Sequence, residues 1–138
     1  MDNNYFTDDK FMKTDAYQEF IKINTGSGKL KIRAFAASEA LPVENIKIIV
    51  STIIGNEKII FFEGKTDSSG MVENIVLPAP KINVNNMEVP NTIDYEITAI
   101  SDDNLKRQVY HVNMYDGICV VQNINYIPSS FGGVINGY

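Results

Sequence analysis

The feature of this sequence that most restricts its fold is a repeated alternation of apolar and polar residues. Leu30, Ile32 and Ala34 alternate with basic residues, and the run from Ile93 to Ala99 alternates in the same way. A period of two places apolar side chains on one face of a β-strand and polar side chains on the other. Each alternating stretch therefore predicts a strand with one buried face.

About seven such stretches follow one another, with turn residues between them. In the segment Thr66–Gly70, Asp67 and Ser68 can fold their side chains onto backbone N–H groups, and Gly70 accepts a positive φ. Asp116–Gly117 is a strong hairpin signal before the last stretch. The predicted fold class is all-β: a seven-stranded antiparallel Greek-key β-sandwich, Ig-like or prealbumin-like, with a short N-terminal helix.

The chain divides into three predicted parts. Residues 1–28 form an N-terminal arm and a short helix, and residues 29–128 form the β-sandwich domain. Residues 129–138 are Gly-rich and are predicted to be a flexible tail. The Asn-rich stretch from Lys81 to Asn91 is the longest predicted loop, and it is available for contacts together with the arm and the tail.

The helix is predicted over Asp15–Ile23. Ala16, Phe20 and Ile23 are spaced so that they would form one apolar stripe along it. Gly26–Gly28 then breaks the chain before the first strand.

Composition sets limits on the partners of the chain. Its 138 residues are 44% hydrophobic, which suffices for one core, and carry a formal net charge of −5. No nucleic-acid partner is expected, because phosphate binding needs a basic face. No membrane partner is expected either, because apolar runs such as Ile46–Ile54 are far shorter than the ~20 residues of a membrane-spanning helix. The polar, acidic stretch Met1–Asp15 is no signal peptide, and Cys119 is the single cysteine, so a cytoplasmic protein, or one incorporated into a spore, is predicted.

The turns and strands resemble those of a known family. The segments on which the resemblance depends are Lys29–Ile32, Leu41–Ile48, Thr66–Gly70 and Tyr95–Ile97. Together they are similar to the carboxypeptidase regulatory-like (transthyretin-like, prealbumin-type) β-sandwich, which has a Pro-Val turn, a Thr-Asp-x-x-Gly turn and a late Tyr-containing strand. The resemblance implies this fold and says little about activity.

Two further segments are similar to the accessory module of clostridial spore cortex-lytic enzymes. They are Leu77–Pro80 and Met114–Gly117, followed by Ile127–Pro128, and the resemblance covers roughly Lys29 to Pro128. It implies a module that lies beside a separate catalytic domain, which this stretch of sequence lacks.

No set of residues meets the requirements of a known catalytic chemistry. His111 is the single histidine, and Cys119 is expected to be a small buried thiol, although the two could lie on adjacent strands as a nucleophile and its base. Hydroxyisourate hydrolases share the prealbumin fold, but they need several histidines and a Tyr-Arg-Gly-Ser ending, whereas this chain ends Ile135–Tyr138. The chain is therefore predicted not to be an enzyme, and no catalytic, cofactor or metal residue is assigned.

Two arrangements remain as alternatives with less support. The Thr66–Gly70 turn, with Glu63 or Glu73, could supply oxygen ligands to Ca²⁺, although the turn already explains Asp67. A Lys–Asn isopeptide bond beside an acid is the second. It would use the following residues: Lys29 or Lys31, Glu96, and Asn123 or Asn125. Lys31 and Glu96 are both expected on the solvent side of their strands.

Phe35, Tyr115 and Tyr126 fall outside the inward register and are candidates for contact with a partner, or for core packing if the register shifts by one residue. The predicted function is a non-catalytic structural or protein-binding module, and the resemblance above implies an association with spores. Its partner would be another protein, or a second copy of the chain through a free sheet edge. The alternative is a module that binds peptidoglycan or another carbohydrate, or serves a cell-wall lytic system.

Overall fold

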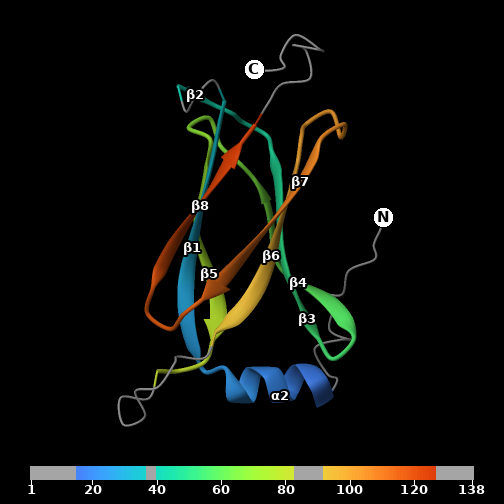
Figure 1. Ribbon diagram of the computed structural model, residues 1–138, viewed down its shortest axis with the longest axis vertical. Coiled ribbons are helices and arrows are strands. Elements are labelled where there is room, and N and C mark those ends of the chain that lie inside the picture. The colour runs from blue at the N-terminus through green and yellow to red at the C-terminus, as the bar shows by residue number, and fades with distance from the viewer. Residues whose placement is uncertain (1–14, 37–39, 83–91, 127–138) are drawn as a thin grey trace.

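The chain folds into two stacked β-sheets with a short helix across one end (Figure 1). The computed structural model describes residues 15–36, 40–82 and 92–126. The elements are α2 (Asp15–Ile23), β1 (Gly26–Ala36), β2 (Leu41–Pro42), β3 (Lys47–Ile54), β4 (Glu57–Lys65), β5 (Met71–Ala79), β6 (Ile93–Ile100), β7 (Arg107–Met114) and β8 (Cys119–Asn125). The predicted β-sandwich is confirmed, with eight strands in place of seven because the two-residue β2 was not foreseen. The predicted arm, most of the Asn-rich loop and the predicted tail lie outside the described residues.

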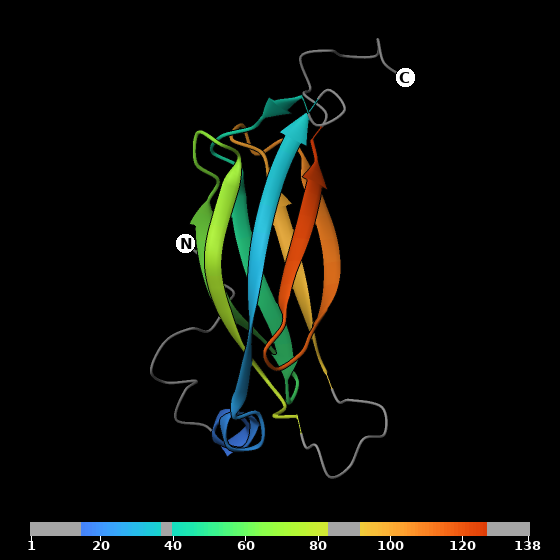
Figure 2. The same cartoon turned by 90° about the vertical axis from the view of Figure 1, so that its left-hand side faces the viewer.

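Sheet A consists of β1, β2, β5 and β8, with β1 at its centre. Antiparallel pairing joins β1 to β5, and β2 pairs with the last two residues of β1. On the other side of β1, β8 runs parallel to it in one unbroken register from Lys29↔Cys119 to Phe35↔Asn125 (Figure 2). This parallel pair is the one departure from the antiparallel arrangement that the sequence predicted.

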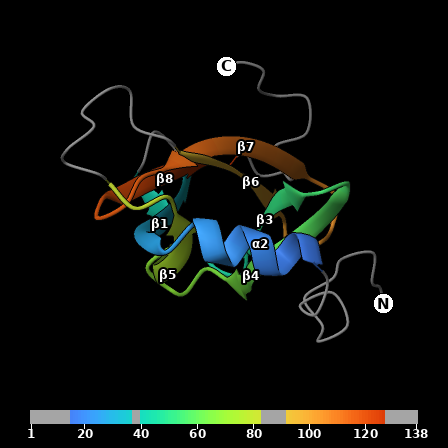
Figure 3. The ribbon, with the colours of Figure 1, turned by 90° about the horizontal axis from the view of Figure 1, so that it is seen from below.

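Sheet B has the strand order β4-β3-β6-β7, and all of its pairs are antiparallel. Seen from below, β7 and β8 lie along one side of the sandwich, and β4 and β5 lie along the other (Figure 3). Among the described residues there are therefore four long edge strands, two from each sheet, besides the two-residue β2 at the end of β1.

The predicted hairpin at Asp116–Gly117 is wrong, although the turn itself is present. Gly117 has a φ of 78°, as a turn glycine can, but β7 belongs to sheet B and β8 to sheet A. The turn carries the chain from one sheet to the other because it is tied to the start of β1. The backbone N–H of Gly117 donates to the carbonyl oxygen of Ser27 at 2.8 Å, and the N–H of Ser27 donates to Asp116 Oδ1 at 3.1 Å.

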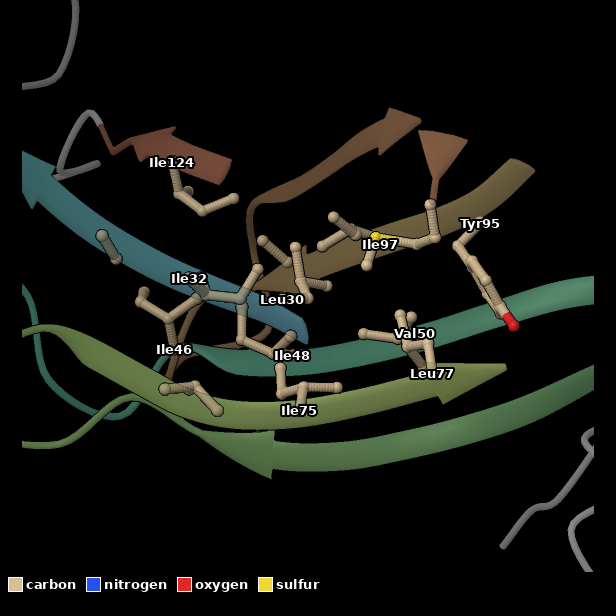
Figure 4. Packing of buried hydrophobic residues seen from close by; sticks show 14 residues of the cluster. Leu30, Ile32, Ile46, Ile48, Val50, Ile75, Leu77, Tyr95, Ile97 and Ile124 are labelled. Carbon is tan, nitrogen blue, oxygen red and sulfur yellow. The ribbon is translucent and has the colours of Figure 1, made fainter. Parts of the chain in front are cut away.

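The main core fills the space between the two sheets (Figure 4). Its buried members are Leu30, Ile32, Ala34, Ile46, Ile48, Val50, Val72, Ile75, Leu77, Tyr95, Ile97, Ala99, Met114 and Ile124. The inward faces predicted for the first strand and for Ile93–Ala99 are confirmed by this burial. Full burial of each Leu or Ile side chain contributes about 1.5–3 kcal/mol, so the period-two pattern accounts for most of the driving force. Tyr95 also satisfies its hydroxyl, which donates to the carbonyl oxygen of Pro78 at 2.7 Å.

Helix α2 covers the lower end of the sandwich through a small second cluster. Tyr17 and Phe20 pack with Ile54 and Ile59, the two buried residues of that cluster. The predicted stripe is wrong at Ile23, which is 59% exposed. The helix ends there, and the next residue caps it: its backbone N–H makes the last helical hydrogen bond to the carbonyl oxygen of Phe20, and its side-chain amide donates to the same oxygen.

Candidate functional site at the free edge of sheet A

Three of the four edge strands carry features that discourage pairing with another strand. β4 contains a bulge in which Phe61 is the extra residue, and it has acidic or basic residues at both ends. β7 carries Arg107 and His111 on its solvent side. β5 is interrupted by a bulge and contains Pro78 near its end. Charges, bulges and proline are the devices by which native edge strands avoid association.

The fourth edge strand, β8, has none of these features. The segment Cys119–Asn125 contains no charged residue and no proline, and its register with β1 is unbroken. Val121 is 48% exposed, and Ile118 directly before the strand is 46% exposed. A regular, uncharged edge with exposed β-branched side chains is the kind that accepts an additional strand.

The pairing of β8 with β1 determines which backbone N–H and C=O groups of β8 remain free. Lys29 N–H donates to the carbonyl oxygen of Ile118 at 2.9 Å, and Tyr126 N–H donates to the carbonyl oxygen of Phe35 at 2.9 Å. Backbone groups alternate in direction along a strand. The N–H and C=O groups of the even-numbered residues of β8 therefore point toward β1, and those of the odd-numbered residues point away from it. The N–H and C=O groups of Cys119 and Val121 consequently point to the free edge.

Two glutamine side chains occupy the upper part of this edge. Gln122 Nε2 donates to the carbonyl oxygen of Asn123, and Gln108 Nε2 donates to that of Asn125, each at 3.0 Å. Among the residues that the structure describes, the carbonyl oxygens of Cys119 and Val121 have no such partner. The most available part of the edge is therefore its beginning, next to Ile118.

Asp116 holds the beginning of β8 in place. Its carboxylate accepts hydrogen bonds from the N–H groups of Ser27 and Ile82, at 3.1 and 3.2 Å. These two backbone donors lower the pKa of Asp116, with a smaller contribution from Lys81. The turn can approach β1 this closely because Gly28 has no side chain, since a Cβ there would lie 2.5 Å from the carbonyl oxygen of the residue before Asp116.

Tyr126 holds the other end of β8. Its side chain is half-buried and packs against the main core. Burial raises the pKa of the Tyr126 hydroxyl, and the nearby carboxylates of Asp103 and Asp102 raise it further. The strand is thus fixed at both ends, while its outer edge remains open.

The outer face of sheet A beside β8 is basic. Lys29, Lys31 and Arg33 point outward from β1, and Lys31 Nζ lies 3.7 Å from a carboxylate oxygen of Glu73. Arg33 donates to Asn123 Oδ1 on β8 at 3.0 Å. The basic row therefore lies one strand away from the free edge.

The three aromatic candidates from the sequence do not form one surface. Phe35 is half-buried on the outer face of β1, and the guanidinium carbon of Arg33 lies 4.7 Å from its ring centroid. Tyr115 is 37% exposed in the turn at the opposite end of the β1–β8 pair, and Tyr126 packs against the core. Contact of any one of them with a partner stays a prediction.

Cys119 and His111 lie on different sheets. The prediction that Cys119 is buried is wrong: its residue is exposed, because the parallel register with β1 turns it to the same face as Lys29. His111 points out of sheet B, and its Nδ1 lies 3.3 Å from Asp94 Oδ2. The two side chains belong to opposite outer faces, so the thiol and the imidazole do not meet.

The calcium and isopeptide arrangements are also not assembled. Asp67 Oδ1 accepts hydrogen bonds from the N–H groups of Ser69 and Met71, at 2.9 and 3.0 Å, as expected for a structural turn. Glu96, the acid of the isopeptide alternative, belongs to sheet B and bonds to Lys58, whereas Lys31 belongs to sheet A. Among the described residues there is no group of three or more His, Cys, Asp or Glu side chains that could hold a metal ion.

Comparison with known proteins finds likenesses among solved structures. No protein-family model matches the chain, and no curated protein matches it in sequence. The solved structure of Klebsiella pneumoniae 5-hydroxyisourate hydrolase is similar to it, with a TM-score of 0.46 and 11% sequence identity over 72% of this chain and 92% of that one. The likeness agrees with the predicted transthyretin-like β-sandwich and concerns the fold alone.

The prediction that the chain is not an enzyme is corrected by this comparison. The matched protein is an enzyme, and the exclusion of catalysis is withdrawn. At 11% identity the likeness assigns no activity to this chain.

Within residues 15–36, 40–82 and 92–126, the structure contains no helix with the length and apolar character that crossing a membrane requires.

Proposed function

We propose that this chain is a protein-binding β-sandwich module that associates by strand pairing at the free edge of β8. The observation that carries the proposal is the contrast between β8, which is uncharged and regular, and the three other edges, which carry charges, a bulge or proline. An added strand would satisfy the outward backbone groups of Cys119 and Val121 and would cover exposed apolar area at Val121 and Ile118.

The occupant that we propose is a second copy of the chain. A strand that adds to β8 must itself be extended, uncharged and unpaired on one side, and β8 meets these conditions. Two copies of β8 in antiparallel pairing would join two A sheets into one continuous sheet. The basic rows of the two β1 strands would then be separated by both copies of β8, about 14 Å apart, which exceeds the screening length of about 8 Å at physiological salt.

Backbone amide exchange of the whole chain tests this proposal strand by strand. The N–H groups of Val120 and Gln122 face β1 and should be protected at every protein concentration. The N–H groups of Cys119 and Val121 should exchange quickly in dilute solution and become protected as the concentration rises. Odd-numbered amides that stay unprotected at the highest concentration would contradict pairing at β8.

Sedimentation of two matched variants tests the same edge. Val121→Lys places a charge on the free edge, whereas Val76→Lys places one at a 56% exposed valine on β5, the opposite edge of the same sheet. We expect the first to be monomeric and the second to associate like the wild type, with a difference of about tenfold or more in Kd. Equal association of the two variants would exclude β8 as the interface, and a monomeric wild type would leave an extended segment of another protein as the partner to seek.

The resemblance to the accessory module of spore cortex-lytic enzymes supports the further proposal that this association occurs in the spore or in a cell-wall lytic system. Co-purification from sporulating and from growing cells tests that setting. Recovery on cell-wall sacculi without any protein partner would favour the peptidoglycan-binding alternative.

A further inference from the structure

A pocket of about 340 Å³ lies on the outer face of sheet B, at the end next to α2. Four strands contribute to its polar lining, which includes Ser51 on β3, Lys58 on β4, Asp94 and Glu96 on β6, and His111 on β7. Phe20 of α2 adds an aromatic wall. The volume falls at the lower end of the range for small-molecule sites, about 300–1,000 Å³.

Ser51 is the unusual member of this lining. It is 1% exposed, and its register partners Glu96 and then His111 place it in the same outward row. Its hydroxyl makes no hydrogen bond to any residue that the structure describes, whereas the buried hydroxyls of Thr66 and Ser101 both have partners. A buried polar group without a partner costs free energy, so such a group requires an explanation.

The charged groups around Ser51 are already paired. Lys58 Nζ lies 2.9 Å from Glu96 Oε2, which also accepts a hydrogen bond from a neighbouring threonine hydroxyl. These contacts lower the pKa of Glu96, with the Lys58 hydrogen bond as the largest cause. His111 Nδ1 lies 3.3 Å from Asp94 Oδ2. Each pair leaves a second carboxylate oxygen available, and Lys58 keeps further N–H donors.

These features define the kind of molecule that would fit. Lys58 already pairs with Glu96, and His111 already contacts Asp94, so a charged ligand would have to compete with these contacts. A neutral molecule with several hydroxyl groups could donate to the free carboxylate oxygens and accept from Lys58 and Ser51. Its C–H face could pack against the ring of Phe20, which is half-buried and lies 5.8 Å, centroid to centroid, from that of Phe61.

We infer that this pocket binds a neutral, polyhydroxylated ring of the size of one sugar residue, with Ser51 as a hydrogen-bonding partner. The site lies on sheet B and is separate from the β8 edge of sheet A, so it neither rests on the proposed strand pairing nor depends on the three aromatic candidates of the sequence. A free monosaccharide and the end residue of a glycan present the same chemistry to it.

Titration of the full chain, followed by backbone amide shifts, tests this inference. The probes are D-glucose, N-acetylglucosamine and myo-inositol as neutral polyols, with methylammonium and acetate as charged controls, up to about 50 mM, a range that covers weak millimolar binding. We expect saturable shifts around Ser51, Glu96 and His111 with at least one neutral probe and none with the charged ones. A soluble oligomer of N-acetylglucosamine that binds more tightly than the monomer would identify a glycan end as the source.

Two buried serines supply a matched pair of variants. Ser51→Ala removes the hydroxyl without a partner, so we expect binding about tenfold weaker and a melting temperature that is unchanged or higher. Ser101→Ala removes a hydroxyl that bonds to Asp103 and to the N–H of Lys106, so we expect unchanged binding and a lower melting temperature. Unaltered binding in Ser51→Ala, a preference for a charged probe, or no saturable shift with any neutral probe would overturn the inference.

Discussion

The two edges of sheet A differ although both pair with the same central strand. β5 lies on one side of β1 and contains a bulge at Glu73 and Asn74, opposite Lys31, with Asn74 at a φ of 64°. β8 lies on the other side and runs without irregularity from Cys119 to Asn125. Both strands turn alternate side chains toward the main core, where β5 buries Val72, Ile75, Leu77 and Ala79 and β8 buries Ile124.

The difference teaches that the tendency of an edge to associate is set by its outward groups and not by its inward ones. A bulge bends the strand and disrupts its ladder, and a charge or a proline removes the benefit of an added strand. β5 combines all three, whereas β8 has none. The comparison predicts that the two edges unfold together in one cooperative transition but differ in their tendency to pair with another strand.

The substitution with the largest expected effect tests whether the two edges unfold together. Leu30 is fully buried at the centre of β1, and Leu30→Ala should lower the free energy of unfolding by about 2–5 kcal/mol. Because both edges depend on β1, urea unfolding followed at residues of β5 and of β8 should give one coincident transition. The outward Lys29→Ala is the control, with an expected change within about 0.5 kcal/mol. Separate transitions for the two edges would show that they are not one cooperative unit.

A smaller effect tests the bulge of β5. A left-handed conformation disfavours a residue with a Cβ, and asparagine tolerates it better than alanine does. Asn74→Ala should therefore lower the free energy of unfolding by about 1 kcal/mol, while Asn74→Gly should leave it within about 0.5 kcal/mol. Chemical unfolding of the three proteins checks this order. Equal stability of the alanine and glycine variants would mean that the bulge does not depend on the conformation of this residue.

The smallest effect concerns the anchor of β8. Because the pKa of Asp116 is lower in the folded chain than its ordinary value of 3.8, its contribution to stability is present above pH 3.8 and is lost as the pH falls through the folded pKa. Asp116→Asn should reduce the loss of melting temperature on acidification. Thermal unfolding at pH 7 and at pH 3 measures it. The variant Asp67→Asn, in a turn remote from β8, is a control for the general effect of removing one carboxylate. A wild-type acid dependence retained in full by Asp116→Asn would contradict this role for the backbone hydrogen bonds.

Much of the strand content could be predicted from local patterns. Leu30, Ile32 and Ala34 face the core because alternation fixes the face of a strand once one side is apolar. Asp67 forms its turn through hydrogen bonds to residues two and four positions further on, and contacts of that range are visible in sequence.

The functional surfaces were less predictable because they depend on neighbours that are distant in the chain. Cys119 was expected in the interior and is exposed, since its face is set by pairing with Lys29. Ser51 carried no signal, because a serine within a hydrophobic strand does not reveal whether its hydroxyl finds a partner. Only the packing around it shows that it is buried beside Glu96 and Lys58.

The sequence by itself determined that this chain forms short strands, which residues of most strands face inward and where most of the turns lie. Those properties follow from side-chain spacing and backbone preferences over a few residues. Only the tertiary structure decided that β8 leaves its expected hairpin partner and pairs in parallel with β1, and hence which edge stays open. The choice rests on contacts between Ser27 and Asp116, and between Lys29 and Ile118, whose closeness in space no local pattern encodes.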